Sequence, residues 1–270
     1  MGQRQYPDSI IEMCLMVHSI YRLAFRQVEG FVRDLLKKMG YGNLPVPSYS
    51  TICRRQAGVF VGQSLDYDEN GQIHLALDST GLKVYGEGEW KVRQHGYSKH
   101  RTWMKLHIAI DVKTQKIVAA KLTTNSEHDG TVAIDLLTGK TEKLSAFSGD
   151  GAYDSFGLRE VLGENVTQII PPPENAVLQP DTEKNPLPPH LKQRNDAVTA
   201  IAEKGRAEWK KDAGYHVRSL NEVVMFRYKS TFGGTLQARK FENQVTEVLL
   251  KCKVLNLFVE TGLPVSELAA

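Results

Sequence analysis

Two aspartates follow apolar stretches, at positions where a carboxylate can do chemistry. Asp78 ends the apolar run that begins at Ile73, and Asp150 follows the run that ends at Ser148. Open α/β sheets expose side chains to a ligand crevice at the carboxyl ends of their strands. A single aspartate there more often terminates a strand or caps a helix. Two of them, each after a buried strand, favour a shared metal site.

A third carboxylate belongs to a mixed polar set near residue 220. Tyr215, Arg218, Glu222 and Lys229 lie at offsets of 3, 7 and 14 from the tyrosine. At about 100° per residue, a single helix would place all four within an arc of roughly 60°. Taken alone, this face is better explained as a solvated one with ion pairs, such as Arg218 with Glu222.

Asp78, Asp150 and Glu222 together supply enough oxygen ligands for two Mg²⁺ ions, which Mn²⁺ is expected to replace. Two such ions, about 3.5–4 Å apart, clamp the attacking and leaving oxygens of an in-line phosphoryl displacement. Magnesium takes few protein carboxylates and completes its shell with water and substrate phosphate. The three carboxylates therefore favour phosphoryl transfer on DNA and do not fit a structural zinc site.

The elements that would position these residues follow from hydrophobic periodicity. Strands are predicted at residues 73–77, 82–90, 102–111, 116–122, 143–148 and 166–170, and helices at 130–137 and 153–162. Asp154 would then lie inside a helix, as a cap or a supporting group for Asp150. His128 and Asp129 follow another strand and reach either the same crevice or only a turn. Strands that meander and then alternate with helices predict a mixed α/β sheet.

The ends of the chain are predicted to be helical. A helical period runs from Pro7 to Met39, and a short helix is expected at residues 51–57, capped by Ser50 and Thr51 and carrying Arg54 and Arg55. This arrangement resembles a helix-turn-helix, although an ordinary helical bundle explains the pattern slightly better. Further helices are expected from about residue 191, at 215–229 and at 242–260, after a Pro-rich stretch at 171–189. We predict a helical DNA-binding region at 1–65 and a catalytic domain at 72–263, with an insertion at about 171–212.

Composition limits the class of protein. With 270 residues, 41% of them hydrophobic and 24% charged, the chain is neither disordered nor a disulfide scaffold. No run of 18 apolar residues exists, and three distant cysteines (Cys14, Cys53 and Cys252) indicate reduced thiols in a cytoplasmic protein. Residues 1–56 hold 8 basic and 4 acidic side chains, residues 57–189 hold 13 and 18, and residues 190–240 hold 11 and 5. Basic ends around an acidic centre suit either solvated surface or a protein that grips polyphosphate.

Three motifs together resemble the DDE transposases of bacterial insertion sequences, in particular the insertion-sequence-five family. They are the stretch Asp78–Gly96, the turn Gly149–Asp154, and the spacing Tyr-x2-Arg-x3-Glu-x6-Lys from Tyr215. The resemblance covers nearly the whole chain from about Tyr6. It implies a ribonuclease-H-like core, a two-metal site, recognition of terminal inverted repeats, and DNA cleavage followed by strand transfer by a nucleoid-associated homo-oligomer.

Under this resemblance, Asp78, Asp150 and Glu222 are the catalytic and metal-binding carboxylates. Tyr215, Arg218 and Lys229 are expected to contact DNA near the cut. Family members usually carry some tens of residues before the segment that starts here at Pro7, so part of the end-recognition region is expected to be missing. Two alternatives share these features: a related endonuclease that cuts without joining, and a truncated DNA-binding regulator of transposition.

Overall fold

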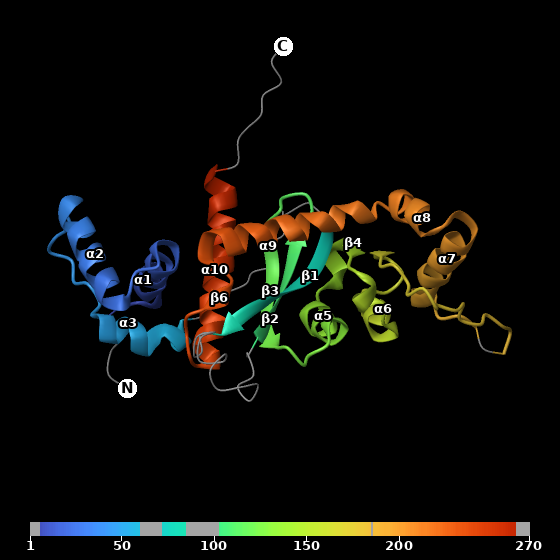
Figure 1. The fold of residues 1–270 in the computed structure, drawn as a ribbon, viewed down its shortest axis with the longest axis horizontal. Helices are drawn as coiled ribbons and strands as arrows, with labels where there is room; N and C mark the ends of the chain where they lie inside the picture. The colour runs from blue at the N-terminus through green and yellow to red at the C-terminus, as the bar shows by residue number, and fades with distance from the viewer. Residues whose placement is uncertain (1–5, 60–71, 85–102, 185, 263–270) are drawn as a thin grey trace, which may run out of the picture. The chain divides into compact units, whose positions relative to one another are not determined.

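The computed structural model describes residues 6–59, 72–84, 103–184 and 186–262 (Figure 1). These residues fall into two compact units, each built from separate stretches of the chain. The helical unit comprises Met1–Gln63, Gly81–Met104 and Arg227–Ala270, and the sheet unit comprises Ser64–Thr80 and Lys105–Phe226. The last helix belongs to the same unit as the N-terminal helices. The division into a DNA-binding region at 1–65 and a catalytic domain at 72–263 stays a prediction.

The sheet has its strands in the order β3-β2-β1-β4-β5, with the short β6 paired to β1. Its strands are β1 Ile73–Val84, β2 Trp103–Asp111, β3 Ile117–Thr124, β4 Leu144–Ser148, β5 Thr167–Ile169 and β6 Thr235–Leu236. β1 runs parallel to β4, and β4 runs parallel to β5. A tight turn joins β2 to β3 as a hairpin. The Asp111 N–H donates to the Lys116 carbonyl at 3.0 Å and closes this turn. This mixed sheet with flanking helices confirms the predicted ribonuclease-H-like fold class.

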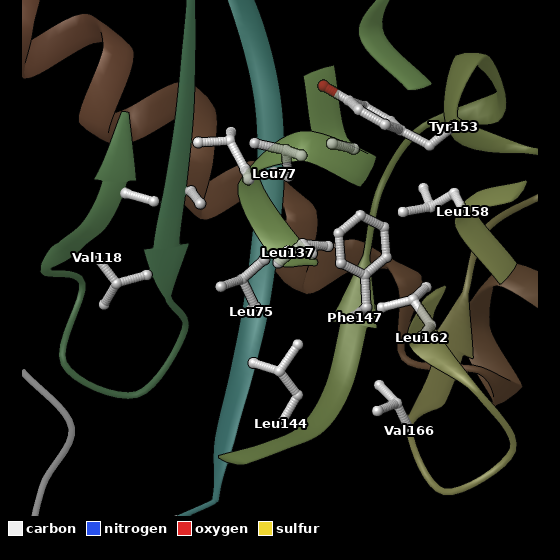
Figure 2. Packing of buried hydrophobic residues seen from close by; sticks show 14 of the residues in the cluster. Leu75, Leu77, Val118, Leu137, Leu144, Phe147, Tyr153, Leu158, Leu162 and Val166 are labelled. Atoms are coloured by element: carbon white, nitrogen blue, oxygen red, sulfur yellow. The ribbon is translucent and has the colours of Figure 1, made fainter. Parts of the chain in front are cut away.

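Helices and short turns of helix connect the strands of the sheet unit. They are α5 Asp129–Leu137, η2 Thr141–Lys143, η3 Gly151–Tyr153, α6 Phe156–Leu162, α7 Pro189–Lys204, α8 Arg206–Asp212 and η4 Tyr215–Arg218, and they are followed by α9 Ser219–Phe232. The hydrophobic core of the unit lies between the sheet and α5, η3 and α6 (Figure 2). Leu75 and Leu77 of β1 and Phe147 of β4 enter it from the sheet, and Leu158 and Leu162 enter it from α6. Alternation along β1 places Asp78 on the opposite side of the strand from Leu75 and Leu77.

The helical unit contains α1 Asp8–Tyr21, α2 Phe25–Lys38, α3 Tyr49–Arg55, η1 Gln56–Gly58 and α10 Phe241–Gly262. Its core joins Ile11, Val28 and Ile52 of the first three helices to Leu250 of α10. Ser48, not the predicted Ser50–Thr51 pair, caps α3, because its hydroxyl accepts a hydrogen bond from the Thr51 N–H. All three cysteines are free thiols. Within the described ranges, none of the helices has the length and apolarity needed to cross a bilayer.

Candidate active site

The two predicted aspartates lie on neighbouring parallel strands. Ala76 of β1 pairs with Ser148 of β4, and Asp78 and Asp150 each follow two residues later. Parallel strands are about 4.8 Å apart, so this register places both carboxylates at the same level of the sheet. Asp150 follows the end of β4, as predicted. Asp78 does not end its strand, because β1 continues to Val84.

The continuation of β1 past Asp78 depends on pairing that the local sequence does not reveal. Lys83 and Val84 pair with Thr235 and Leu236 of β6. Gly81 lies against the Trp103 ring, whose Cε3 would be only 3.2 Å from a Cβ at position 81. The glycine and polar residues after Asp78 suggest that the strand stops there. It continues because its end pairs with β6 and because Gly81 has no side chain to clash with Trp103.

The turn after β4 fixes Asp150. Its carboxylate accepts a hydrogen bond from the Ala152 N–H at 2.9 Å and caps the short helix η3. The Tyr153 ring lies where a side chain at residue 149 would be, since a Cβ there would be 2.8 Å from Tyr153 Cδ2. The same ring packs edge-on against the Phe147 ring, with 6.1 Å between the two ring centres. Glycine at 149 is therefore required for the turn that presents Asp150.

The spacing of the four signature residues predicts that they share one helix, but the structure divides them between two. Tyr215 and Arg218 lie in the short 3₁₀ helix η4, and Glu222 and Lys229 lie in α9. Gly214, in the left-handed region at φ +67°, separates η4 from α8. Glu222 is thus in the first turn of α9, where the positive end of the helix dipole stabilises a carboxylate.

Arg218 joins two of the predicted carboxylates directly. Its Nη1 donates to Asp78 Oδ2 at 2.7 Å, and its Nη2 donates to Glu222 Oε1 at 2.9 Å. The Asp78 side chain is 16% exposed, whereas that of Glu222 is 60% exposed. The arginine thus spans from a nearly buried carboxylate on the central strand to an accessible one on α9. Asp78 and Arg218 are 140 positions apart in the sequence.

Tyr215 restrains this arginine. The Arg218 guanidinium carbon lies 5.8 Å from the centre of the Tyr215 ring. The Lys210 ammonium is 5.0 Å from the same ring centre, and the Trp209 ring is 6.4 Å away. Two cations near one aromatic ring form a small basic cluster beside the carboxylates.

The pKa shifts show that the carboxylates interact. Burial raises the pKa of Asp78, and the negative charges of Asp150 and Glu222 raise it further. The Ser79 N–H and the Arg218 guanidinium act in the opposite direction without cancelling the increase. Burial acts to lower the pKa of Arg218, but Tyr215 and the three carboxylates outweigh it, so the pKa of Arg218 is raised. Asp150 is therefore an electrostatic neighbour of Asp78, and Arg218 is the cation that the cluster stabilises.

The donor chemistry suits a hard cation, although the side chains are not arranged as a closed cage. In the part of the chain that the structure describes, no group of three or more His, Cys, Asp or Glu side chains has a metal-holding arrangement. Asp78 and Glu222 both turn their oxygens to Arg218 instead. Burial is the main cause of the raised Asp78 pKa, and the negative charges of Asp150 and Glu222 add to it. The three carboxylates therefore fit Mg²⁺ by the type of their donor atoms.

Asp154 pairs with two buried arginines and does not belong to the carboxylate cluster. It lies between η3 and α6, not inside a helix as predicted. Arg159 donates to its Oδ1 at 2.8 Å and Arg194 to its Oδ2 at 3.2 Å, and its side chain is 2% exposed. Arg159 also donates to Gln168 of β5. Asp154 thus joins α6, β5 and α7 through buried arginines.

Asp129 anchors a second polar cluster. Lys105 Nζ donates to its Oδ1 at 3.0 Å, and Nδ1 of the fully buried His107 is 3.5 Å from the same oxygen. His107 Nε2 is 2.9 Å from the Thr123 hydroxyl. Burial lowers the pKa of His107 to about 4, although Asp129 acts to raise it. Asp129 also contributes to the raised pKa of Tyr153, which is caused mainly by burial.

Arg54 and Arg55 of α3 differ in their contacts and in their exposure to solvent. Arg55 donates to the Tyr6 carbonyl and to the Asp8 carboxylate, which ties α3 to the start of α1. Arg54 is exposed, and its Nε donates to the Ser50 carbonyl one turn earlier in its own helix. The structure thus gives Arg55 a packing role and leaves Arg54 at the surface. Lys229 lies seven residues after Glu222 on the exposed side of α9.

Comparison with known proteins identifies the family. A family model described as a transposase DDE domain matches residues 69–257, which include Asp78, Asp150 and Glu222. The chain belongs to the transposase DDE domain family. A second model with the same description matches residues 2–87. These matches extend to DDE transposases in general and do not distinguish the insertion-sequence-five group.

One solved structure is similar to this DDE transposase family member at low identity. It is the cryo-EM structure of a piggyBac transposase synaptic complex with hairpin DNA. It is 12% identical, the match covers 96% of this chain and 74% of that chain, and the TM-score is 0.34. A likeness of this size supports no inference about how the present chain works.

Proposed function

We propose that this chain is a metal-dependent DNA transposase of the insertion-sequence-five group, which binds the terminal inverted repeats of its element, cuts there and joins the ends to target DNA. The observation that carries the proposal is the Asp78–Arg218–Glu222 bridge beside Asp150, inside the region matched by the transposase family model. It joins three separate sequence motifs around one cluster of charge.

Asp78, Asp150 and Glu222 would hold Mg²⁺, or Mn²⁺ in its place. The ions supply charge neutralisation of a phosphate and activation of the attacking oxygen. The Asp78 side chain is only 16% exposed, which limits water around the cluster. Glu222 is exposed, so one side stays open to a large substrate. An open side is required because duplex DNA cannot enter an enclosed pocket.

The protein groups around the carboxylates orient them and receive the DNA. The Ala152 N–H fixes Asp150, and the Ser79 N–H donates to Asp78 Oδ1 at 2.8 Å. Arg218 already carries hydrogen-bond donors pointing at anionic oxygens, so a DNA phosphate can take the place of a carboxylate as its partner. Tyr215 limits the directions in which the guanidinium can move. We infer that Arg218 and Tyr215 position the phosphate near the cut and that Lys229 contacts the same strand.

A strand-transfer assay tests this function. The substrate is a labelled duplex that carries the inverted repeat located by sequencing the DNA flanking the reading frame, incubated with Mg²⁺ and a target plasmid. Joined product supports the transposase, and cleavage without joining would indicate an endonuclease. Sequence-specific binding without any chemistry would indicate a DNA-binding regulator. Sedimentation of the protein with and without the repeat duplex tests the homo-oligomer expected in the DNA complex.

A further inference from the structure

The exposed face of α9 contains an aromatic side chain that the proposed chemistry does not use. Phe226 is 71% exposed, the most of any large hydrophobic side chain among the residues described. Its helical neighbours Val224 and Tyr228 are buried at 2% and 1% exposure. The helix therefore buries one face in the ordinary way and leaves Phe226 on the opposite face.

Phe226 shares that face with Glu222. Four residues separate them, which corresponds to about 6 Å along the helix axis and about 40° around it. Lys229 follows about 4.5 Å further along and returns to within about 20° of Glu222. Val223, at 40% exposure, completes the exposed apolar surface next to Phe226. The aromatic ring thus lies between the carboxylate and the ammonium on one stripe of one helix.

The surroundings of Phe226 favour a nucleic acid over a protein partner. The apolar part of the stripe is limited to Val223 and Phe226, far less than the roughly 1,000 Å² that a specific protein interface buries. Basic side chains outnumber acidic ones by 11 to 5 in residues 190–240, which include this helix. A single exposed ring in a basic setting is how proteins hold unpaired bases, since cations follow the phosphates and the ring stacks on the base.

We propose that Phe226 stacks on a nucleobase of the DNA strand next to the cut, and so holds the end of the element unpaired. The inference rests on the proposed function, which places the cut phosphate at Glu222. A strand that runs from Glu222 towards Lys229 must pass over Phe226. The distance of about 6 Å from Glu222 equals nearly two stacked base steps of 3.4 Å. Phe226 therefore meets a base within two nucleotides of the cut.

The test uses the repeat duplex with 2-aminopurine at each of the two positions on either side of the cut, without metal so that no cleavage occurs. Binding of the full chain should change the fluorescence at one of these positions, because the base leaves its neighbours and meets the ring. Phe226→Ala should abolish that change and should weaken binding to a duplex with a splayed end roughly 5- to 150-fold, the range for loss of one base–aromatic stack. Phe226→Trp should restore both.

Phe241→Ala is the matched control, because Phe241 is also an exposed phenylalanine at a helical position, 47% exposed at the start of α10. It should leave the fluorescence and the affinity unchanged. Thermal melting of each variant verifies folding, and Phe226→Trp separates loss of the ring from loss of structure. An unchanged signal in Phe226→Ala, or dissociation of an oligomer as its only effect, would overturn the inference. A wild-type chain that shows the Phe226-dependent signal but cuts no end with Mg²⁺ would contradict the proposed function instead.

Discussion

At the scale of single residues, Arg218 joins Asp78 and Glu222 in one hydrogen-bonded network. Under the proposed function, Asp78, Asp150 and Glu222 should each be indispensable for cleavage and joining. Asp78→Asn, Asp150→Asn and Glu222→Gln each keep the shape of the side chain but remove a negative charge needed by two dications. Each should lower cleavage and joining by orders of magnitude in the strand-transfer assay. Binding to the repeat duplex should survive, because phosphate contacts come from Lys and Arg.

The control for these substitutions should be an aspartate without a buried role. Asp154 is unsuitable, because it holds two buried arginines. Asp135 is 64% exposed and pairs with Lys121, which is 37% exposed, so Asp135→Asn should change neither stability nor activity measurably. If Glu222→Gln cuts and joins as well as Asp135→Asn does, the assignment of the carboxylates is wrong.

His107 should make the stability of the fold depend on pH. Burial lowers its folded pKa to about 4 from an ordinary value of 6.5, and Lys105 and Lys121 act in the same direction while Asp129 opposes them. Between these values the unfolded chain binds the extra proton, so the stability present above pH 6.5 is lost as pH falls towards 4. Urea unfolding should therefore show a midpoint that decreases from pH 7 to pH 5.

His107→Gln should flatten this pH dependence, because it removes the titrating group. The dependence should not vanish, since burial also lowers the pKa of His74. The absolute stability of the variant is not the test, because the bond to Thr123 is altered as well. An unaltered slope between pH 7 and pH 5 in the variant would show that His107 is not the responsible group.

At the scale of elements, the Asp154 cluster should control the stability of the sheet unit. Asp154→Asn would leave Arg159 and Arg194 buried without a full negative charge, since their side chains are 1% and 7% exposed. Breaking a buried pair of this kind costs about 3–5 kcal/mol. Chemical denaturation should show a loss of this size, with Asp135→Asn as the exposed reference. A loss below about 1 kcal/mol would mean that water replaces the carboxylate at little cost.

The two arginines of α3 should have different roles, Arg55 in packing and Arg54 in DNA contact. Arg55→Ala removes contacts to Tyr6 and Asp8 that tie α3 to α1, and should lower the stability of the helical unit by about 1 kcal/mol. Arg54→Ala should leave melting unchanged and weaken binding to the repeat duplex, because Arg54 is exposed. Equal losses of binding in both variants, with no change in melting, would contradict the division.

The fold class could be predicted from sequence, and the candidate site residues could be selected from it, because both depend on local patterns. Alternating hydrophobicity identified the strands around Asp78 and Asp150, and the spacing after Tyr215 singled out Arg218 and Glu222. The extent of β1 could not be predicted, because it depends on pairing with β6, which begins at Thr235. The change from the 3₁₀ helix η4 to the α-helix α9 was missed, because the spacing suits a continuous α-helix equally well. Phe226 was missed too, although its position four residues after Glu222 marks the same face.

Side-chain partners in a charged cluster are the least predictable feature. Arg218 pairs with Glu222 as its spacing suggests, but its bond to Asp78 depends on how η4 meets β1. Asp154 lies only four residues after Asp150, so the sequence leaves the partners of its side chain open. Only the fold shows that Asp154 faces Arg159 and Arg194, whereas Asp150 lies beside Asp78. Short-range patterns identify candidates, and long-range packing assigns their roles.

At the scale of the whole molecule, the charge distribution should make DNA affinity strongly dependent on salt. Residues 1–56 carry 8 basic against 4 acidic side chains and residues 190–240 carry 11 against 5, whereas residues 57–189 carry 13 against 18. If the two basic segments follow the phosphates, binding releases counterions, and log K should fall against log salt with a slope of roughly −0.9 per phosphate neutralised. Fluorescence anisotropy with the repeat duplex from 50 to 200 mM salt measures this slope.

The salt slope can also locate the contact. Lys210 and Lys211 lie in α8 next to Tyr215 and the carboxylate cluster, so Lys210→Gln with Lys211→Gln should reduce the slope by roughly 2, about 1 for each lysine. Lys113→Gln with Lys140→Gln removes the same amount of charge from the acidic middle segment, and should leave the slope unchanged. Equal effects of the two pairs would mean that the slope reports net charge alone. Affinity that stays constant over the salt range would exclude both basic segments from the DNA interface.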